Sequence, residues 1–249
     1  MAITCLLRRY VLCCALFAAP PCMAGNIAPF QLVSGNLSPF TVEDSTESPG
    51  ALGLIAQELS LRLGHPAQIR FYPWARAVAM AQYQPRTAIL PLTRTPERET
   101  QYRWLVKLYR QNFVFITRSN PDFDVNSLDV LRQKRIVLLR SSPNLRQLQQ
   151  RNFRNVVEVN SVADMARMLR RNMVDAVYGG EMIGIRTLQA HGFRPDELLV
   201  GMTLDAGDIW LAGSRDFTEA DSAAWQEAMD GLVRDGTYRR ILRQYRLPE

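Results

Sequence analysis

Short apolar runs alternate with longer stretches of helical period from about residue 28 to the C-terminus. The apolar runs predict strands at residues 28–33, 68–72, 87–91, 113–118, 135–139, 156–159, 175–178 and 208–212. Strands that alternate with helices in this way are typical of an α/β protein whose strands are mainly parallel.

The clearest helical patterns cover residues 53–63, 161–171, 219–234 and 238–245. Gly64 directly follows the first pattern and predicts its end, because glycine readily adopts the backbone conformation that terminates a helix. Ser161 and Asp164 stand in capping positions at the start of the second. The last two helices are joined by Asp235, Gly236 and Thr237, which predict a helix stop followed by a new helix start.

Residues 117–129 interrupt this alternation. They follow a long apolar strand, have the composition of a linker, and precede a second α/β series. Length alone does not decide between one large domain and two smaller ones.

The first two dozen residues have the pattern of a secretory signal peptide. Arg8 and Arg9 precede an apolar run at residues 11–19, and a small-residue ending predicts cleavage after Ala24. The run is too short to span a bilayer as a helix. All the cysteines fall within this leader: Cys5, Cys13, Cys14 and Cys22. We therefore expect a periplasmic protein without disulfides, thiol nucleophiles or thiolate metal sites.

Composition excludes several classes of protein. With 47% hydrophobic and 22% charged residues, the chain is neither disordered, nor collagen-like, nor a coiled coil. The formal charge is +6, but only Lys107 and Lys134 are lysines, and the arginines are scattered along the chain. This dispersal argues against a nucleic-acid surface.

Several motifs, in order, resemble the periplasmic solute-binding proteins of the polar amino-acid type, extracellular solute-binding family three. The similar stretches are residues 38–40 (SPF), 50–59 (GALGLIAQEL), 71–77 (FYPWARA), 92–99 (LTRTPERE) and 235–238 (DGTY) with Tyr245. The third resembles the PWxRA variant of one branch of that family. The similarity extends over almost the whole chain after the leader.

The resemblance implies an α/β fold of the two-lobed periplasmic-binding-protein type, known as type II or Venus-flytrap, with two crossover strands. Residues 25–116 and 206–249 would form lobe one, and residues 117–205 would form lobe two. A ligand would be held between the lobes, beyond the carboxyl ends of the strands. We expect ligand to bind lobe one first, and lobe two then to close over it.

The resemblance also implies which residues bind ligand. Arg98 would hold a ligand carboxylate through its guanidinium fork, with Thr93 as a hydroxyl donor. Arg98 alternatively belongs to a surface turn, paired with Glu97 or Glu99. In lobe two, Arg140 and Ser141 precede a helix whose free amides suit an anion. An N-cap by Ser141 or Ser142 is the alternative.

Trp74 and Arg76 follow a strand and begin a helix, where they form either a cleft wall or part of the packing. Two positions depart from the family's pattern. Gly180 stands where amino-acid-binding members have an aspartate for the ligand's ammonium group, and Leu37 stands where an aromatic residue is common. Glu181 is adjacent to Gly180 and is a candidate substitute.

The sequence therefore predicts an exported, monomeric protein that captures a small polar, carboxylate-bearing ligand, an amino acid or a related metabolite, for ABC-type uptake through a membrane permease. Two alternatives stay open. One is a periplasmic sensor that contacts a membrane signalling receptor. The other is an enzyme like the cyclohexadienyl dehydratases, with Glu181 and Arg98 as a minimal site. The sequence contains no serine elbow, phosphate loop or H-E-x-x-H motif, so we expect a binder without cofactor or metal rather than an enzyme.

Overall fold

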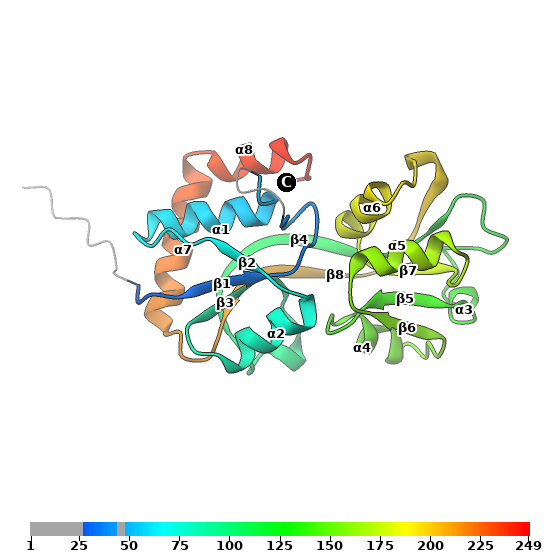
Figure 1. Ribbon diagram of the computed structural model, residues 1–249, viewed down its shortest axis with the longest axis horizontal. Coiled ribbons are helices and arrows are strands. Elements are labelled where there is room, and N and C mark those ends of the chain that lie inside the picture. The colour runs from blue at the N-terminus through cyan, green and yellow to red at the C-terminus, as the bar shows by residue number, and fades with distance from the viewer. Residues whose placement is uncertain (1–26, 44–47) are drawn as a thin grey trace, which may run out of the picture.

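The protein has two α/β lobes that lie side by side and are joined by two long strands (Figure 1). The computed structural model describes residues 27–43 and 48–249. The proposed signal peptide, residues 1–24, and the four cysteines within it lie outside the described residues.

The described part of lobe one contains three parallel strands of its own and four α-helices. Its strands are β1 (Gln31–Ser34), β2 (Ile69–Phe71) and β3 (Thr87–Thr93), and its helices are α1 (Ala51–Arg62), α2 (Trp74–Tyr83), α7 (Glu219–Arg234) and α8 (Thr237–Gln244), with the short 3-10 turn η1 (Pro96–Arg98). In Figure 1, α1, α7 and α8 lie on one side of these strands and α2 on the other.

Lobe two repeats this arrangement on a smaller scale. Its parallel strands are β5 (Ile136–Leu139), β6 (Val156–Val159) and β7 (Ala176–Gly180), and its helices are α3 (Leu128–Leu131), α4 (Asn144–Gln149), α5 (Val162–Arg170) and α6 (Glu181–Ala190), with the 3-10 turn η2 (Pro195–Glu197). Helices α5 and α6 lie on one side of the strands and α4 on the other.

The strands β4 (Arg103–Arg118) and β8 (Leu198–Gly213) run through both lobes. They pair antiparallel from one end to the other and occupy the middle of a single sheet of order β2-β1-β3-β8-β4-β7-β5-β6. At about 3.3 Å per residue, each strand of 16 residues spans about 50 Å. These are the two crossover strands that the family resemblance implies.

All eight predicted strands are present, but β4 and β8 are far longer than the predicted 113–118 and 208–212. Charged and amide side chains interrupt the apolar run of β4, and two aspartates interrupt that of β8, so alternation alone marked only one end of each strand. The linker-like segment at 117–129 contains the end of β4, a loop and the first two residues of α3 (Leu128–Leu131). The boundary between residues 116 and 117 stays a prediction, since β4 already pairs with β7 from Phe113 onward.

The four predicted helices are confirmed, and α7 has the predicted bounds. Ser161 caps α5, because its Oγ accepts a hydrogen bond from the amide of Asp164 at 3.1 Å. Gly236 has a φ of 79° between α7 and α8, the left-handed conformation that the predicted helix stop requires.

Three apolar clusters form the core. One packs α1, α7 and α8 on lobe one around the fully buried Trp225. Another lies within lobe two around Phe115 and Tyr178. The remaining cluster extends from lobe one to lobe two and includes Trp74 and Leu139. The two lobes therefore meet across buried apolar side chains at the cleft.

An ion pair ties α7 to the turn before β3. Arg86 Nη1 lies 2.9 Å from Asp221 Oδ2, and the guanidinium carbon lies 4.1 Å from the centroid of the Phe217 ring. Asp221 also completes the helix start, since Oδ2 accepts from the Thr218 amide at 2.7 Å. Burial raises the pKa of Asp221, but the bonds from Arg86 and Thr218 outweigh it and hold the pKa below its usual 3.8.

Replacing Asp221 with Asn is expected to lower the free energy of unfolding by about 2 kcal/mol at pH 7, because Arg86 loses its carboxylate and the helix cap is weakened. The midpoint of thermal unfolding should fall by roughly 4–8 °C. A carboxyl whose pKa is lower in the folded protein than in the unfolded chain stabilises the fold at pH values above its unfolded-state pKa. This stabilisation is lost as the pH falls through its folded-state pKa. The difference between variant and wild type should therefore shrink below about pH 4.

Glu219→Gln is the matched control, since the Glu219 side chain is 92% exposed and lies 3.9 Å from Arg103. We expect this change to cost less than about 0.5 kcal/mol. Equal losses in the two variants would show that the buried ion pair contributes nothing specific.

Candidate functional site

A partly open cavity of about 60 Å³ lies between the lobes, beside the place where β4 and β8 pass from one lobe to the other. It is lined from lobe one by Leu37, Trp74, Pro91, Thr93 and Arg98, from β4 by Gln111 and Phe113, and from lobe two by Leu139, Ser142, Pro143, Asn144, Val162, Met165, Tyr178, Gly179, Gly180, Ile183 and Gly184. Apolar walls with a few polar groups are typical of small-molecule sites.

The cavity lies at the carboxyl ends of strands from both lobes. Thr93 is the last residue of β3, Leu139 the last of β5, and Gly180 the last of β7. Each strand ends in a turn or helix start, so backbone groups and side chains converge on this point. This is where open α/β sheets generally bind their ligands.

Arg98 reaches from η1 across the boundary between the lobes. Its Nη1 donates to the Thr93 carbonyl at 3.1 Å, and its Nη2 donates to the Ser141 carbonyl at 2.7 Å. Burial lowers the pKa of Arg98 from its usual 12.5, but an arginine stays charged in proteins. No ion pair among the described residues involves it, so a desolvated positive charge faces the cleft with only carbonyl partners.

The alternative surface role of Arg98 is not what the structure shows. Glu97 lies 2.8 Å from Arg146, and Glu99 lies 2.5 Å from Arg94, so each glutamate pairs with a different arginine. The pair of Glu97 and Arg146 joins η1 of lobe one to α4 of lobe two. It is a second interlobe contact, close to that made by Arg98.

Of the other lobe-one candidates, Thr93 and Trp74 line the cavity and Arg76 does not. Trp74 is 6% exposed and belongs to the cluster that extends between the lobes, so it serves both as a cleft wall and as packing. Arg76 is exposed, and its guanidinium carbon lies 4.9 Å from the centroid of the Tyr72 ring.

In the turn after β5, Ser141 contacts Arg98 at the cleft through its backbone carbonyl and not through its side chain. Ser141 has a φ of 62°, and its carbonyl accepts from Arg98. Arg140 and Ser141 line an outer depression of about 730 Å³ instead of the cavity. The alternative role of Ser141 or Ser142 as an N-cap is wrong, since Pro143 holds the N-cap position of α4 and Ser142 Oγ donates to the Leu139 carbonyl at 2.6 Å.

Glu181 begins α6 outside the lining of the cavity. Its Oε2 accepts from Asn112 Nδ2 at 3.3 Å. Successive side chains of a strand point to opposite faces, so Asn112 lies on the face of β4 opposite to the cavity-lining Gln111 and Phe113. Glu181 therefore does not occupy the place of the aspartate missing at Gly180.

Gln111 fills that place. A Cβ atom added to Gly180 would lie 2.4 Å from Gln111 Oε1 and 2.7 Å from its Cδ. A side chain at position 180 and the amide of Gln111 thus compete for the same space. The glycine at the end of β7 is what allows a side chain from β4 to reach the cavity.

Three polar atoms of cavity-lining residues are buried without a hydrogen-bond partner among the described residues. They are Trp74 Nε1, Gln111 Oε1 and Asn144 Oδ1. The residues are only 6%, 7% and 4% exposed, respectively. Unsatisfied buried polar groups are costly, and a bound ligand is one way of satisfying them.

Sequence reasoning missed Gln111 and Asn144. Gln111 carries a weak signal, an uncharged amide within a run of strand residues between positions 103 and 118. Asn144 carries none, because an asparagine after Ser-Ser-Pro resembles an ordinary helix start. Its Nδ2 donates to the Tyr178 carbonyl at 3.4 Å, which turns Oδ1 away from that strand.

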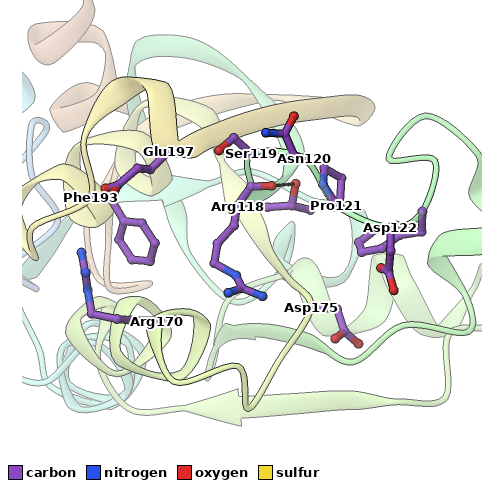
Figure 2. Close-up of a pocket in the computed structure, with 11 residues that line it drawn as sticks. Arg118, Ser119, Asn120, Pro121, Asp122, Arg170, Asp175, Phe193 and Glu197 are labelled. Atoms are coloured by element: carbon purple, nitrogen blue, oxygen red, sulfur yellow. Dashed lines mark hydrogen bonds between the residues drawn. The ribbon is translucent and has the colours of Figure 1, made fainter.

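A larger depression of about 610 Å³ lies on lobe two beside the loop after β4 (Figure 2). Two of its charged residues, Arg170 and Asp175, have partners of their own. The guanidinium carbon of Arg170 lies 4.2 Å from the centroid of the Phe193 ring, and Asp175 lies 2.7 Å from Arg135. The interlobe cavity, with its buried unpaired groups, is the stronger ligand site.

Within residues 27–43 and 48–249, no group of three or more His, Cys, Asp or Glu residues is arranged to hold a metal ion. No helix in this part of the chain is long and apolar enough to cross a membrane.

The sequence matches no protein-family model, and no curated protein sequence is significantly similar to it. Solved structures do match. A histidine kinase sensor domain with similarity to periplasmic binding proteins has a TM-score of 0.77 at 17% identity, over 87% of this chain and 95% of that one. An arginine third transport system periplasmic binding protein from Legionella pneumophila has a TM-score of 0.76 at 18% identity, over 88% of this chain and 100% of that one.

The GluR0 ligand-binding core from Nostoc punctiforme, solved in complex with L-glutamate, has a TM-score of 0.75 at 16% identity, over 88% of this chain and 100% of that one. These similarities extend through both lobes and the strands between them. The protein has the two-lobed fold of periplasmic binding proteins.

Proposed function

We propose that this protein is an exported solute-binding protein that captures a small carboxylate-bearing ligand between its lobes. The observation that carries the proposal is the interlobe cavity lined by Arg98, a half-buried residue whose desolvated guanidinium has no carboxylate partner among the described residues.

The energetics of Arg98 favour an anionic ligand. A buried charge without a counter-ion is costly, and two carbonyls compensate a guanidinium only in part. Arg98 uses one N–H of Nη1 and one of Nη2 for Thr93 and Ser141, and a guanidinium has five N–H donors. The remaining donors suit a carboxylate, whose binding would supply the missing negative charge.

The contacts between the lobes suggest how capture occurs. In an open form, Arg98 and Thr93 on lobe one meet the ligand first. Closure then brings the Ser141 carbonyl to Arg98 and Arg146 to Glu97, and it encloses the ligand beneath Tyr178 and the glycines of β7. The paired strands β4 and β8 pass between the lobes and are where such bending would take place.

The bound protein would deliver its ligand to a membrane permease for ABC-type uptake. Membership of the polar amino-acid type of solute-binding proteins, in its PWxRA branch, is part of this proposal. A second candidate is a sensor that presents the ligand to a membrane receptor, supported by the similarity to a histidine kinase sensor domain. We propose a binder rather than an enzyme, since Glu181, the carboxyl of the minimal enzymatic site, lies outside the cavity.

Thermal unfolding against a panel of amino acids, organic acids, polyamines and prephenate tests the proposal. A ligand at about a hundred times its dissociation constant should stabilise the protein by about 2.7 kcal/mol. Stabilisation by carboxylates only is the expected result. Stabilisation by polyamines alone would overturn the proposed function. If prephenate stabilises the protein, an activity assay follows, and conversion of prephenate would identify an enzyme.

Arg98→Ala should weaken the binding of any carboxylate found in this panel by about 30-fold or more, because the carboxylate loses its buried counter-ion. Arg76→Ala is the matched control, an exposed arginine on the same lobe. It should change the affinity by less than about threefold. Titration calorimetry measures both variants, and circular dichroism checks that they fold. Equal affinities for Arg98→Ala and wild type would remove Arg98 from the site.

Export predicts a defined mature protein. Expressed with its leader in a Gram-negative host, the chain should be recovered from the periplasm with Gly25 at its N-terminus. All four cysteines precede this point, so the mature protein should not react with thiol reagents even when denatured. N-terminal sequencing and intact-mass measurement check this. Recovery of full-length protein from the cytoplasm would contradict it.

A further inference from the structure

We propose that the interlobe cavity selects small hydroxy-carboxylates over the corresponding α-amino acids. This rests on the proposed function, since Arg98 is taken to bind the carboxylate, and it adds the nature of the ligand's second polar group. The observations that carry it are the absence of any carboxylate from the described lining and the uncharged acceptors that stand there instead.

The charge of the cavity favours a ligand with a single negative charge. Arg98 is the only ionised side chain in the described lining. Burial raises the pKa of Tyr178, whose neutral hydroxyl donates to Gln147 Oε1 at 3.0 Å. A hydroxy-carboxylate therefore brings the buried charge of cavity and ligand to zero. A zwitterionic amino acid adds an ammonium as well and leaves one positive charge uncompensated, which a desolvated site disfavours.

Three carboxylates near the cavity are engaged elsewhere, and a fourth, Glu43, is exposed in a neighbouring depression outside the lining. Glu97 pairs with Arg146, Glu181 accepts from Asn112, and Asp205 accepts from Gln147 Nε2 at 3.1 Å. Each of these partners is outside the cavity lining. None of the three carboxylates faces the place that an ammonium group would occupy.

The hydrogen-bonding groups favour a hydroxyl. Gln111 Oε1 and Asn144 Oδ1 are buried acceptors without a donor, and Trp74 Nε1 is a buried donor without an acceptor. A hydroxyl both donates and accepts, so one group can serve both kinds of atom. A 2-oxo group only accepts and would leave both amide oxygens unpaired, and an aliphatic acid would leave all three atoms unpaired.

The shape of the site keeps the amide of Gln111 in place. Gly180 provides the space in which its Oε1 lies, and a Cβ there would lie 2.4 Å from that oxygen. The cavity of about 60 Å³ has room for a few water-sized groups, so the ligand is small. A ligand on the scale of lactate suits this volume, and its hydroxyl can pair Trp74 Nε1 and one of the two amide oxygens.

Titration calorimetry with matched compounds tests the inference. L-Lactate should bind at least about tenfold more tightly than L-alanine, pyruvate or propionate, which differ from it only at the second carbon. Glycolate and glycine provide a second matched pair. Binding of L-alanine equal to or tighter than that of L-lactate would overturn the inference while leaving capture of a carboxylate by Arg98 intact. If no member of either series binds while another carboxylate of the wider panel stabilises the protein, the inference fails and the proposed function stands. If no carboxylate of the panel binds, both fail.

Gln111→Glu tests the residue. It places a carboxylate where the neutral amide lies, so the affinity for L-lactate should fall by about tenfold or more while the affinity for L-alanine rises. Gln149→Glu is the control, because Gln149 is exposed at the end of α4 and the same charge change there should alter neither affinity.

Gln111→Ala covers the case in which the charged variant does not fold. Removal of the acceptor should lower the affinity for L-lactate by about tenfold. The affinity for propionate, which has no hydroxyl, should stay unchanged. A parallel loss for both compounds would indicate general damage to the cleft and would overturn the role of Gln111.

Discussion

The antiparallel pairing of β4 with β8 along their whole length is the constraint on which the rest of the structure depends. These two strands join the sheets of both lobes into one and carry the chain between them. The pairing runs from end to end with register shifts along it, and this register sets which residues of β4 face the cleft. Gln111 and Phe113 face it because they lie two positions apart on one side of β4 at the crossing.

Close to the place where β4 and β8 pass between the lobes, Arg98 carries a positive charge that no carboxylate of the described residues neutralises. Arg98 is desolvated, and two carbonyls are its partners in the part of the chain that the structure describes. A fold selected only for stability would pair such a group or leave it in water. Such departures from local stability are expected at functional sites, because the bound ligand provides the counter-charge and hydrogen-bond partners that the protein lacks there. The unpaired atoms of Gln111 and Asn144 belong to the same pattern.

Gly180 and Gln111 form one feature, although 69 positions separate them in the chain. From the sequence, Gly180 is only the absence of an aspartate. In the structure, the missing side chain at the end of β7 is the condition for the amide from β4 to enter the cavity. The charge of the site changes as a result, because a neutral acceptor stands where the family resemblance leads one to expect a carboxylate.

The sequence by itself determined the α/β class, the places of all eight strands and four helices, and Arg98 and Thr93 as candidates at the cleft, because these follow from local periodicity, turn chemistry and an ordered set of motifs. It left Trp74 open between a cleft wall and packing. Tertiary structure alone decided the full length of β4 and β8, the exclusion of Arg76, Arg140 and Glu181 from the cavity, and the entry of Gln111 and Asn144. The physical reason is that strand length and side-chain direction depend on pairing between residues distant in the chain. No local sequence pattern shows that β4 and β7 are neighbours, or that Gln111 of β4 fills the space left by the missing side chain at Gly180 of β7.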